Sequence, residues 1–173
     1  MINSSLIGYG KWGKNIFNTI IKNKNINLEY IAKKNTKNFT IPNFKKKIVQ
    51  SYSKAINNRV DAVFIATPSE SHFKIAKKAL IQKKHVFIEK PVCLFNKDFI
   101  ELKKIALKNS LVLHINYIHL YNENLIKLKN LIKKISQIDK YKIKILFGNN
   151  GPVRKKISPL MDYGPHIFSI VNF

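Results

Sequence analysis

Short apolar runs alternate along this chain with segments in which apolar residues recur at helical spacing. The apolar runs predict strands that end at residue 7 and that cover residues 27–32, 62–66, 85–89 and 111–115, with a further short strand around 48–49. The helical spacing predicts helices from the glycines at 8–13 to about residue 22, over 70–82 and over 96–109. Apolar runs closed by proline or glycine are typical of buried parallel strands. The steady alternation predicts an α/β fold, a doubly wound parallel sheet of the Rossmann type.

The pattern changes near residue 121. A helix is expected over 122–135, followed by one alternating strand over 141–147, a loop with glycine and proline, and a last apolar stretch. A single long strand leaves backbone groups unpaired and an apolar face uncovered. We therefore expect two domains, a Rossmann domain over 1–120 and the start of an incomplete α+β domain over 121–173.

Composition narrows the possible functions. The net charge of +23 is typical of nucleic-acid binders, but the chain has 30 lysines and only 2 arginines. Lysine, asparagine and isoleucine, all encoded by A/T-rich codons, make up 77 of its 173 residues. The lysines are spread over every predicted helix and form no basic stripe interleaved with aromatic residues. No specific nucleic-acid partner is predicted.

Cysteine content and hydropathy bear on the compartment. The only cysteine, Cys93, excludes an internal disulfide and disfavours a structural zinc site, and no metal site is predicted. Polar Asn3, Ser4 and Ser5 interrupt the first apolar residues, unlike a signal peptide. No segment approaches the roughly 18 apolar residues of a membrane span. We expect a reduced cytoplasmic protein with no membrane partner.

Three glycines, Gly8, Gly10 and Gly13, stand between the first strand and the first helix. In the dinucleotide fingerprint the first permits a tight turn, the second admits a pyrophosphate and the third lets the helix pack close to the strand. The helix N-terminus then offers N–H groups and partial positive charge to the phosphates. A glycine-rich turn without a ligand is the alternative, and the strand–loop–helix context favours nucleotide binding.

The end of the second predicted strand distinguishes the two nicotinamide cofactors. The acid that binds the ribose hydroxyls of NAD is absent there, and Lys33 and Lys34 take its place. Cations suit the 2′-phosphate of NADP, so NADP is favoured over NAD. The general richness in lysine is a competing explanation, and both cofactors stay open.

The strand over 85–89 ends in Glu89, Lys90 and Pro91. Parallel sheets hold ligands just beyond the carboxyl ends of their strands, so Lys90 is expected at the edge of a cleft. A lysine in such a place can carry a proton in catalysis. The alternative is an ordinary surface lysine after a strand.

Several motifs follow one another along nearly the whole chain. They are the glycine loop with Lys14 and Asn15, residues 61–68, Ser71-His72, Ala79-Leu80, residues 84–86, Glu89-Lys90-Pro91, Asn116-Tyr117 and Asp162-Tyr163-Gly164-Pro165-His166. Together they resemble the Gfo/Idh/MocA family of oxidoreductases, the relatives of glucose–fructose oxidoreductase and inositol dehydrogenase. The residues of the first and last motifs are similar to those of members that act on sugars or sugar nucleotides.

The resemblance implies hydride transfer between NAD or NADP and the hydroxyl or ketone of a sugar, sugar nucleotide or polyol. In such enzymes the histidine of the last motif, here His166, acts as general base or acid, a role that suits imidazole. Asp162 would orient that ring or bind a substrate hydroxyl. Lys90 would bridge the nicotinamide ribose and the substrate. A structural role for each of these residues is the alternative.

The resemblance also implies a set of cofactor contacts. Thr67, Pro68 and His72 would line the adenosine and ribose side of the cleft, and Glu89 and Asn116 the nicotinamide side. The full set of expected cofactor-binding residues is Gly8, Gly10, Lys11, Trp12, Gly13, Lys33, Lys34, Thr67, Pro68, His72, Glu89, Lys90 and Asn116.

The chain departs from the family pattern in its second part. Family members have a full second domain with a large open sheet, of which one strand is readable here, and the acid often found three residues after the histidine is Ser169. The chain is therefore expected to be truncated in this domain. One hypothesis is an oxidoreductase completed by homo-oligomerisation or by a complementing C-terminal chain. The other is a catalytically incomplete module that binds nucleotide without turnover.

Overall fold

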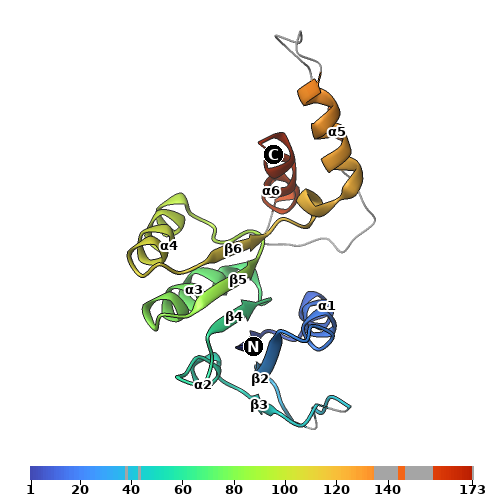
Figure 1. The fold of residues 1–173 in the computed structure, drawn as a ribbon. Coiled ribbons are helices and arrows are strands. Elements are labelled where there is room, and N and C mark those ends of the chain that lie inside the picture. The colour runs from blue at the N-terminus through green and yellow to red at the C-terminus, as the bar shows by residue number, and fades with distance from the viewer. Residues whose placement is uncertain (38, 43, 135–143, 147–157, 173) are drawn as a thin grey trace. The chain divides into compact units, whose positions relative to one another are not determined.

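The computed structural model describes residues 1–37, 39–42, 44–134, 144–146 and 158–172. The chain forms two compact units, Met1–Asn116 and Tyr117–Phe173. The described part of the first unit contains a six-stranded sheet with helices on both faces, and the described elements of the second unit are helical (Figure 1).

The sheet of the first unit is parallel throughout. Its strands lie in the order β3-β2-β1-β4-β5-β6. They are β1 (Ile2–Ile7), β2 (Ile26–Ala32), β3 (Lys47–Val49), β4 (Ala62–Ile65), β5 (His85–Glu89) and β6 (Leu113–Asn116). The chain builds outward from β1 to β3, returns to β4 beside β1 and then builds outward the other way. This is the doubly wound Rossmann order, so the predicted fold class is confirmed.

Helix α1 (Lys11–Ile20) covers one face of the sheet, and α2 (Tyr52–Ala55), α3 (His72–Ile81) and α4 (Asn96–Lys108) cover the other (Figure 1). The apolar stripe of α1, namely Ile16, Phe17 and Ile20, is buried against Leu6 and Ile31 of the strands. This burial is why the spacing of apolar residues predicted the helix correctly.

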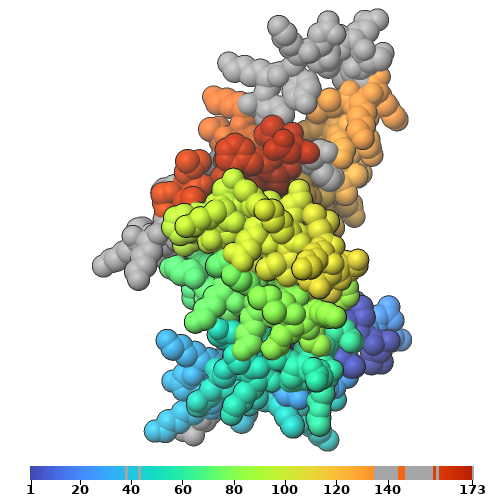
Figure 2. All heavy atoms as spheres, turned by 90° about the vertical axis from the view of Figure 1, so that its left-hand side faces the viewer, coloured from blue at the N-terminus to red at the C-terminus, as the bar shows by residue number. Residues whose placement is uncertain are grey.

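The opposite face holds the larger core. Buried residues of α3 and α4, including Leu80 and Leu102, pack with Val63, Val86 and Ile88 of the strands. Figure 2 looks onto this face, where the green atoms of α3 lie against the yellow-green atoms of α4. The two helices are also joined at their surface by an ion pair between Lys77 Nζ and Glu101 Oε1 at 2.6 Å.

Three local features differ from the sequence-based expectations. The helix predicted over 70–82 begins with a 3₁₀ turn, η1 (Ser69–Ser71), before α3. The four-residue α2 was not predicted, and the Ser51 hydroxyl caps it by accepting from the Ser53 backbone N–H at 3.2 Å. The strand expected over 111–115 was expected to be buried, but all four residues of the corresponding β6 are half-buried. Since β6 is an edge strand of the described sheet, it lacks a neighbouring strand on one side.

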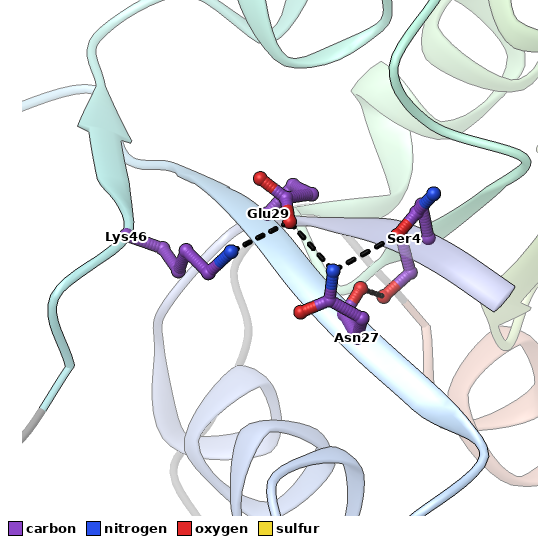
Figure 3. A network of polar contacts seen from close by, with 5 residues as sticks. Ser4, Asn27, Glu29 and Lys46 are labelled. Atoms are coloured by element: carbon purple, nitrogen blue, oxygen red, sulfur yellow. Dashed lines mark hydrogen bonds and ion pairs between the residues drawn. The ribbon is translucent and has the colours of Figure 1, made fainter. Parts of the chain in front are cut away.

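A polar network joins β1, β2 and the residue before β3 (Figure 3). The Asn27 amide donates to the side-chain oxygens of Asn3 at 2.9 Å and of Glu29 at 2.6 Å, and Lys46 Nζ contacts the same Glu29 oxygen at 2.7 Å. The hydrogen bond from Lys46 lowers the pKa of Glu29. The register of β1 against β2 shifts after Ser4 and leaves Glu29 opposite no residue of β1, as in a β-bulge.

The second unit contains the 3₁₀ turn η2 (Ile118–Tyr121), α5 (Glu123–Lys134) and α6 (Pro159–Val171). The helix expected over 122–135 is confirmed within the described residues. The strand expected over 141–147 falls outside them, apart from residues 144–146, which have no regular structure. The domain boundary at 120 and the α+β character of the second domain stay predictions. Across the described ranges, no helix combines the length and apolarity needed to cross a membrane.

Candidate functional site

The parallel sheet brings most of the predicted cofactor-binding residues of the first unit to one edge. Strands β1, β2, β4, β5 and β6 all end there, because parallel strands share their carboxyl edge. The glycine loop follows β1, Lys33 and Lys34 follow β2, and Thr67 and Pro68 follow β4. Glu89 ends β5 and Lys90 follows it, and Asn116 ends β6. Strands β1 and β4 are neighbours at the point where the winding reverses, which is where such sheets bind ligands.

Two of the three loop glycines leave no room for a side chain. Gly8 has a φ of +95°, and a Cβ there would lie 2.4 Å from the backbone oxygen of Ala66. A Cβ on Gly13 would lie 2.2 Å from the backbone oxygen of Gly8. Real Cβ atoms essentially never show contacts this short, so both positions require glycine for the close approach of β1, β4 and α1.

Gly10 differs from its two neighbours. A Cβ on Gly10 would meet no atom within 4 Å, and its backbone lies in the extended region that any residue can adopt. The fold therefore does not require glycine at this position. A ligand that needs close approach to the backbone does require it, and a pyrophosphate is such a ligand.

The N-terminus of α1 suits an anionic ligand. Gly10 is the N-cap residue and has no side chain to accept from the first-turn N–H groups, and no acidic residue occupies the first turn. Lys11 and Trp12 of this turn are exposed. Helix N-termini carry unsatisfied N–H groups and partial positive charge, so the residues present fit the phosphates of a dinucleotide.

The loop after β2 is attached to the glycine loop by aromatic contacts. The Tyr9 ring lies edge-on to Phe17 and to Phe39, both at 5.4 Å between centroids, and burial raises the pKa of Tyr9. Lys33 Nζ donates to the Asn35 carbonyl at 2.6 Å and lies 4.7 Å from the centroid of Phe39. Lys34 is exposed. This places the two predicted lysines differently, Lys33 held by its own loop and Lys34 facing solvent.

The loops after β4 and β5 are joined by His72. This side chain is only 1% exposed. Its Nδ1 lies 2.7 Å from the Pro91 carbonyl oxygen and its Nε2 lies 2.8 Å from that of Thr67. Both ring nitrogens are therefore occupied within the protein. The Thr67 hydroxyl is in turn hydrogen-bonded to Ser71 at 2.7 Å.

Glu89 and Asn116 meet across the last two strands. They are register partners in β5 and β6, and the Asn116 amide donates to Glu89 Oε1 at 2.7 Å. Glu89 is buried. Lys90 follows directly, is half-buried and precedes a cis peptide bond to Pro91. The structure thus places the expected nicotinamide-side residues together.

The other two predicted catalytic residues belong to the second unit. Asp162 and His166 lie one turn apart in α6, whose first turn is capped by the Ser158 hydroxyl accepting from the Met161 N–H at 3.3 Å. The segment is helical, as the expected shared face of Asp162 and His166 requires. His166 is buried, and its ring lies edge-on to that of His119 at 4.6 Å between centroids. Within the described residues, no group of three His, Cys, Asp or Glu side chains could hold a metal ion.

Sequence reasoning missed the contacts between residues far apart in the chain. Neither the attachment of Tyr9 to Phe39 nor the two carbonyl partners of His72 was predicted. No periodicity or motif indicates which carbonyl a side chain meets. The short spacing between Thr67 and His72 is the only signal that could have been used.

Comparison with known proteins gives one family for the first unit. The family model described as "Oxidoreductase family, NAD-binding Rossmann fold", GFO_IDH_MocA, matches residues 2–117. The uncharacterised oxidoreductase YrbE of Bacillus subtilis is 25% identical over 119 residues, which cover 66% of this chain and 35% of YrbE. The uncharacterised oxidoreductase sll0816 of Synechocystis is 44% identical over 50 residues, 29% of this chain and 14% of that protein.

Solved structures share the fold. The Bacillus subtilis protein yvaA superposes with a TM-score of 0.86 at 20% identity and covers 99% of this chain and 52% of its own. The scyllo-inositol dehydrogenase of Lactobacillus casei, solved with NAD(H) and scyllo-inositol, has a TM-score of 0.68 at 20% identity, covering 78% of this chain and 41% of its own. At these identities the likeness is one of fold. The chain spans about half the length of the solved structures and 35% of YrbE.

Proposed function

Because the chain belongs to the Gfo/Idh/MocA oxidoreductase family, with its NAD-binding Rossmann fold, we propose that it binds a nicotinamide dinucleotide along the carboxyl edge of the sheet. One observation carries this proposal. Close backbone packing requires glycine at positions 8 and 13. A Cβ added to Gly10 would enter open space, and Gly10 lies at the start of α1, which has no side-chain cap. A bound pyrophosphate explains a glycine at a position where the fold has no need of one.

We propose NADP as the preferred cofactor, with NAD as the weaker one. Lys34 is exposed at the end of β2, where an acid would otherwise bind the ribose hydroxyls of NAD, and Lys33 is held beside it. An ammonium group there attracts the 2′-phosphate. The Lys34→Glu variant is expected to lose about tenfold in NADPH affinity and little in NADH affinity. Equal losses for both cofactors would contradict this preference.

The proposed reaction is hydride transfer to or from a carbon that carries a hydroxyl or ketone. When bound, the nicotinamide supplies the hydride acceptor or donor. In the oxidation direction His166 accepts the hydroxyl proton while the hydride leaves the same carbon. Lys90 stabilises the developing alkoxide, and Asp162, one turn before His166 in α6, orients that imidazole or binds a substrate hydroxyl.

The proposed substrates are sugars, sugar nucleotides or polyols. The scyllo-inositol dehydrogenase of Lactobacillus casei, which shares the fold, makes scyllo-inositol the first polyol to test. We place the reaction in the cytoplasm, where a protein with one cysteine and no disulfide fits. Homo-oligomerisation or a complementing C-terminal chain stays a prediction, measured by solution mass and by activity of the chain alone and with added partner.

Calorimetric titration of the purified chain with NADPH and NADH tests the binding proposal. The wild type is expected to bind at least one dinucleotide. The Gly10→Ala variant is expected to lose less than about 1 kcal/mol of stability, since its methyl group enters open space, and to bind at least about tenfold more weakly. A wild type that binds neither dinucleotide, or a variant that binds as tightly as the wild type, would overturn the proposal.

A substrate screen with the cofactor that binds tests the reaction. His166→Asn is expected to lower kcat by about 10²–10⁴, as for loss of a general base. His85→Asn is the matched control, because His85 begins β5 at the opposite edge of the sheet, and it is expected to keep full activity. Cofactor binding without turnover of any sugar or polyol would favour the catalytically incomplete module.

A further inference from the structure

The chain after β2 is fixed beside the glycine loop by backbone hydrogen bonds. The Gly8 N–H donates at 2.9 Å to the carbonyl of Ala32, the last residue of β2. Lys33 follows directly, and its own N–H donates at 2.9 Å to the carbonyl of Val49, the last residue of β3. The backbone of Lys33 therefore lies next to the turn that receives the phosphates in the proposed function.

The ammonium group of Lys33 is held in place as well. Its Nζ donates to the Asn35 carbonyl at 2.6 Å and lies 4.7 Å from the centroid of the Phe39 ring, within the range of a cation–π interaction. An ammonium group has three N–H donors, so one carbonyl leaves donors for a further acceptor. A carbonyl and a ring face bring no negative charge, so these contacts fix the position of the ammonium group without pairing it with an anion.

The Phe39 ring is itself attached to the glycine loop. It lies edge-on to the ring of Tyr9 at 5.4 Å between centroids, and Tyr9 lies edge-on to Phe17 of α1 at the same distance. The Phe39 N–H also donates to the Thr36 carbonyl at 3.1 Å. Edge-on pairs are a favoured arrangement of aromatic rings. A continuous row of contacts thus links helix α1 through two rings to the ammonium group of Lys33.

We propose that Phe39 is a positioning residue that sets the preference for NADP over NAD, because its ring holds the Lys33 ammonium group where the 2′-phosphate binds. The inference rests on the proposed function, in which the lysines after β2 face the ribose of the cofactor. A side chain that is already fixed loses less conformational entropy when the ligand binds. NADH lacks the 2′-phosphate and gains nothing from the fixed charge. The exposed Lys34 attracts the same phosphate from a side chain that faces solvent.

Phe44 provides a matched control in the same loop. Its ring lies edge-on to Phe17 at 5.6 Å between centroids, so it packs on the same helix as the row that contains Phe39. Among the described residues, the lysine rings contacts of this loop involve Phe39 and not Phe44. Replacing Phe44 removes a comparable aromatic contact and leaves the position of the Lys33 ammonium group unchanged.

Titration of the full chain with NADPH and with NADH tests the inference. Phe39→Leu is expected to bind NADPH at least about threefold more weakly and NADH as tightly as the wild type, whereas Phe39→Tyr, which retains the ring face, keeps the wild-type ratio of affinities. Phe44→Leu is expected to keep this ratio too. A merely structural role of Phe39 would weaken both cofactors alike.

The outcomes separate this inference from the proposed function. A wild type that binds neither dinucleotide would overturn both. A wild type that binds, with an unchanged NADPH-to-NADH ratio in Phe39→Leu, would overturn the role of Phe39 alone. If Phe39→Leu fails to fold, Lys33→Met decides, because loss of the ammonium group must lower the ratio by at least as much, and an unchanged ratio would refute the inference.

Proton–carbon NMR of lysine-labelled protein tests the contact without any cofactor. The face of an aromatic ring moves the signals of nearby protons upfield. The ε-methylene signal of Lys33, identified by its loss in Lys33→Met, is therefore expected to move downfield in Phe39→Leu and to stay in place in Phe44→Leu. A Lys33 signal at the same position in Phe39→Leu and in the wild type would show that the ring does not hold the ammonium group, and the inference would fall.

Discussion

Replacing Gly13 by alanine tests the packing of the glycine loop most directly. Gly13 lies in the first turn of α1, where alanine is ordinarily the better residue by about 1 kcal/mol. The structure predicts the opposite result at this position. The new methyl carbon would lie 2.2 Å from the carbonyl oxygen of Gly8 and 2.9 Å from its carbonyl carbon.

The magnitude follows from what would have to move. Cβ contacts below 3.0 Å essentially do not occur. Both groups are backbone, so α1 and the turn after β1 must separate by close to 1 Å across an interface that contains buried Phe17 and Ile20. Overpacking of this kind costs about 1–3 kcal/mol, with a rigid backbone at the upper end. After the gain in helix propensity, we expect a net loss of about 2 kcal/mol.

Urea unfolding followed by fluorescence measures this loss. The only tryptophan, Trp12, precedes Gly13 and reports on this part of the first unit. A loss of about 2 kcal/mol corresponds to a midpoint lower by roughly 1 M urea. Gly10→Ala is the matched control, because its methyl group enters open space, and it should change stability by less than about 1 kcal/mol. Equal stability of the two variants would refute the steric argument.

Three further predictions concern other parts of the first unit. Because the hydrogen bond from Lys46 lowers the pKa of Glu29, the charged carboxyl stabilises the fold above its ordinary pKa, and this contribution is lost as the pH falls through the lowered pKa. Urea unfolding should therefore show Glu29→Gln less stable than the wild type by up to about 1 kcal/mol at pH 7 and equal to it in acid, and a pH-independent difference would contradict this. Leu102→Ala should lose about 2–5 kcal/mol in the same assay, since Leu102 is fully buried, whereas Leu107→Ala on the exposed side of α4 should change stability by less than about 0.5 kcal/mol. Burial, and secondarily the charge of Asp98, raise the pKa of the Cys93 thiol, so a thiol reagent near pH 8 should modify the folded protein more slowly than the urea-unfolded chain, and equal rates would contradict the raised pKa.

Local pattern was enough for much of the first unit. The structure contains the strands expected over 27–32, 62–66 and 85–89 close to those limits. It also contains the helix expected after the glycines, as α1, and the helix expected over 96–109, as α4. Burial repeats with a period of two or 3.6 residues in regular elements, and these periods are properties of nearby residues. The parallel sheet then follows from the alternation of strand and helix, because the crossover helices return each strand to the same direction.

The candidate site was predictable to the extent that its residues follow strand ends. Lys33, Thr67, Glu89 and Asn116 lie at the carboxyl edge because each ends or follows a parallel strand. Strand ends do not predict that Lys90 and His166 act in one site, since the two residues belong to different units. Their joint action stays a proposal, tested by the kinetics of their variants.

By itself, then, the sequence determined the order and type of the elements and the residues at the ends of the strands. Only the tertiary structure decided that Gly10 has space while Gly13 has none, that Tyr9 meets Phe39, and that His72 lies between two carbonyls. The physical reason is the range of the interactions along the chain. Periodicity and turn chemistry act over a few neighbouring residues, whereas free space and hydrogen-bond partners depend on atoms brought together from distant parts of the chain.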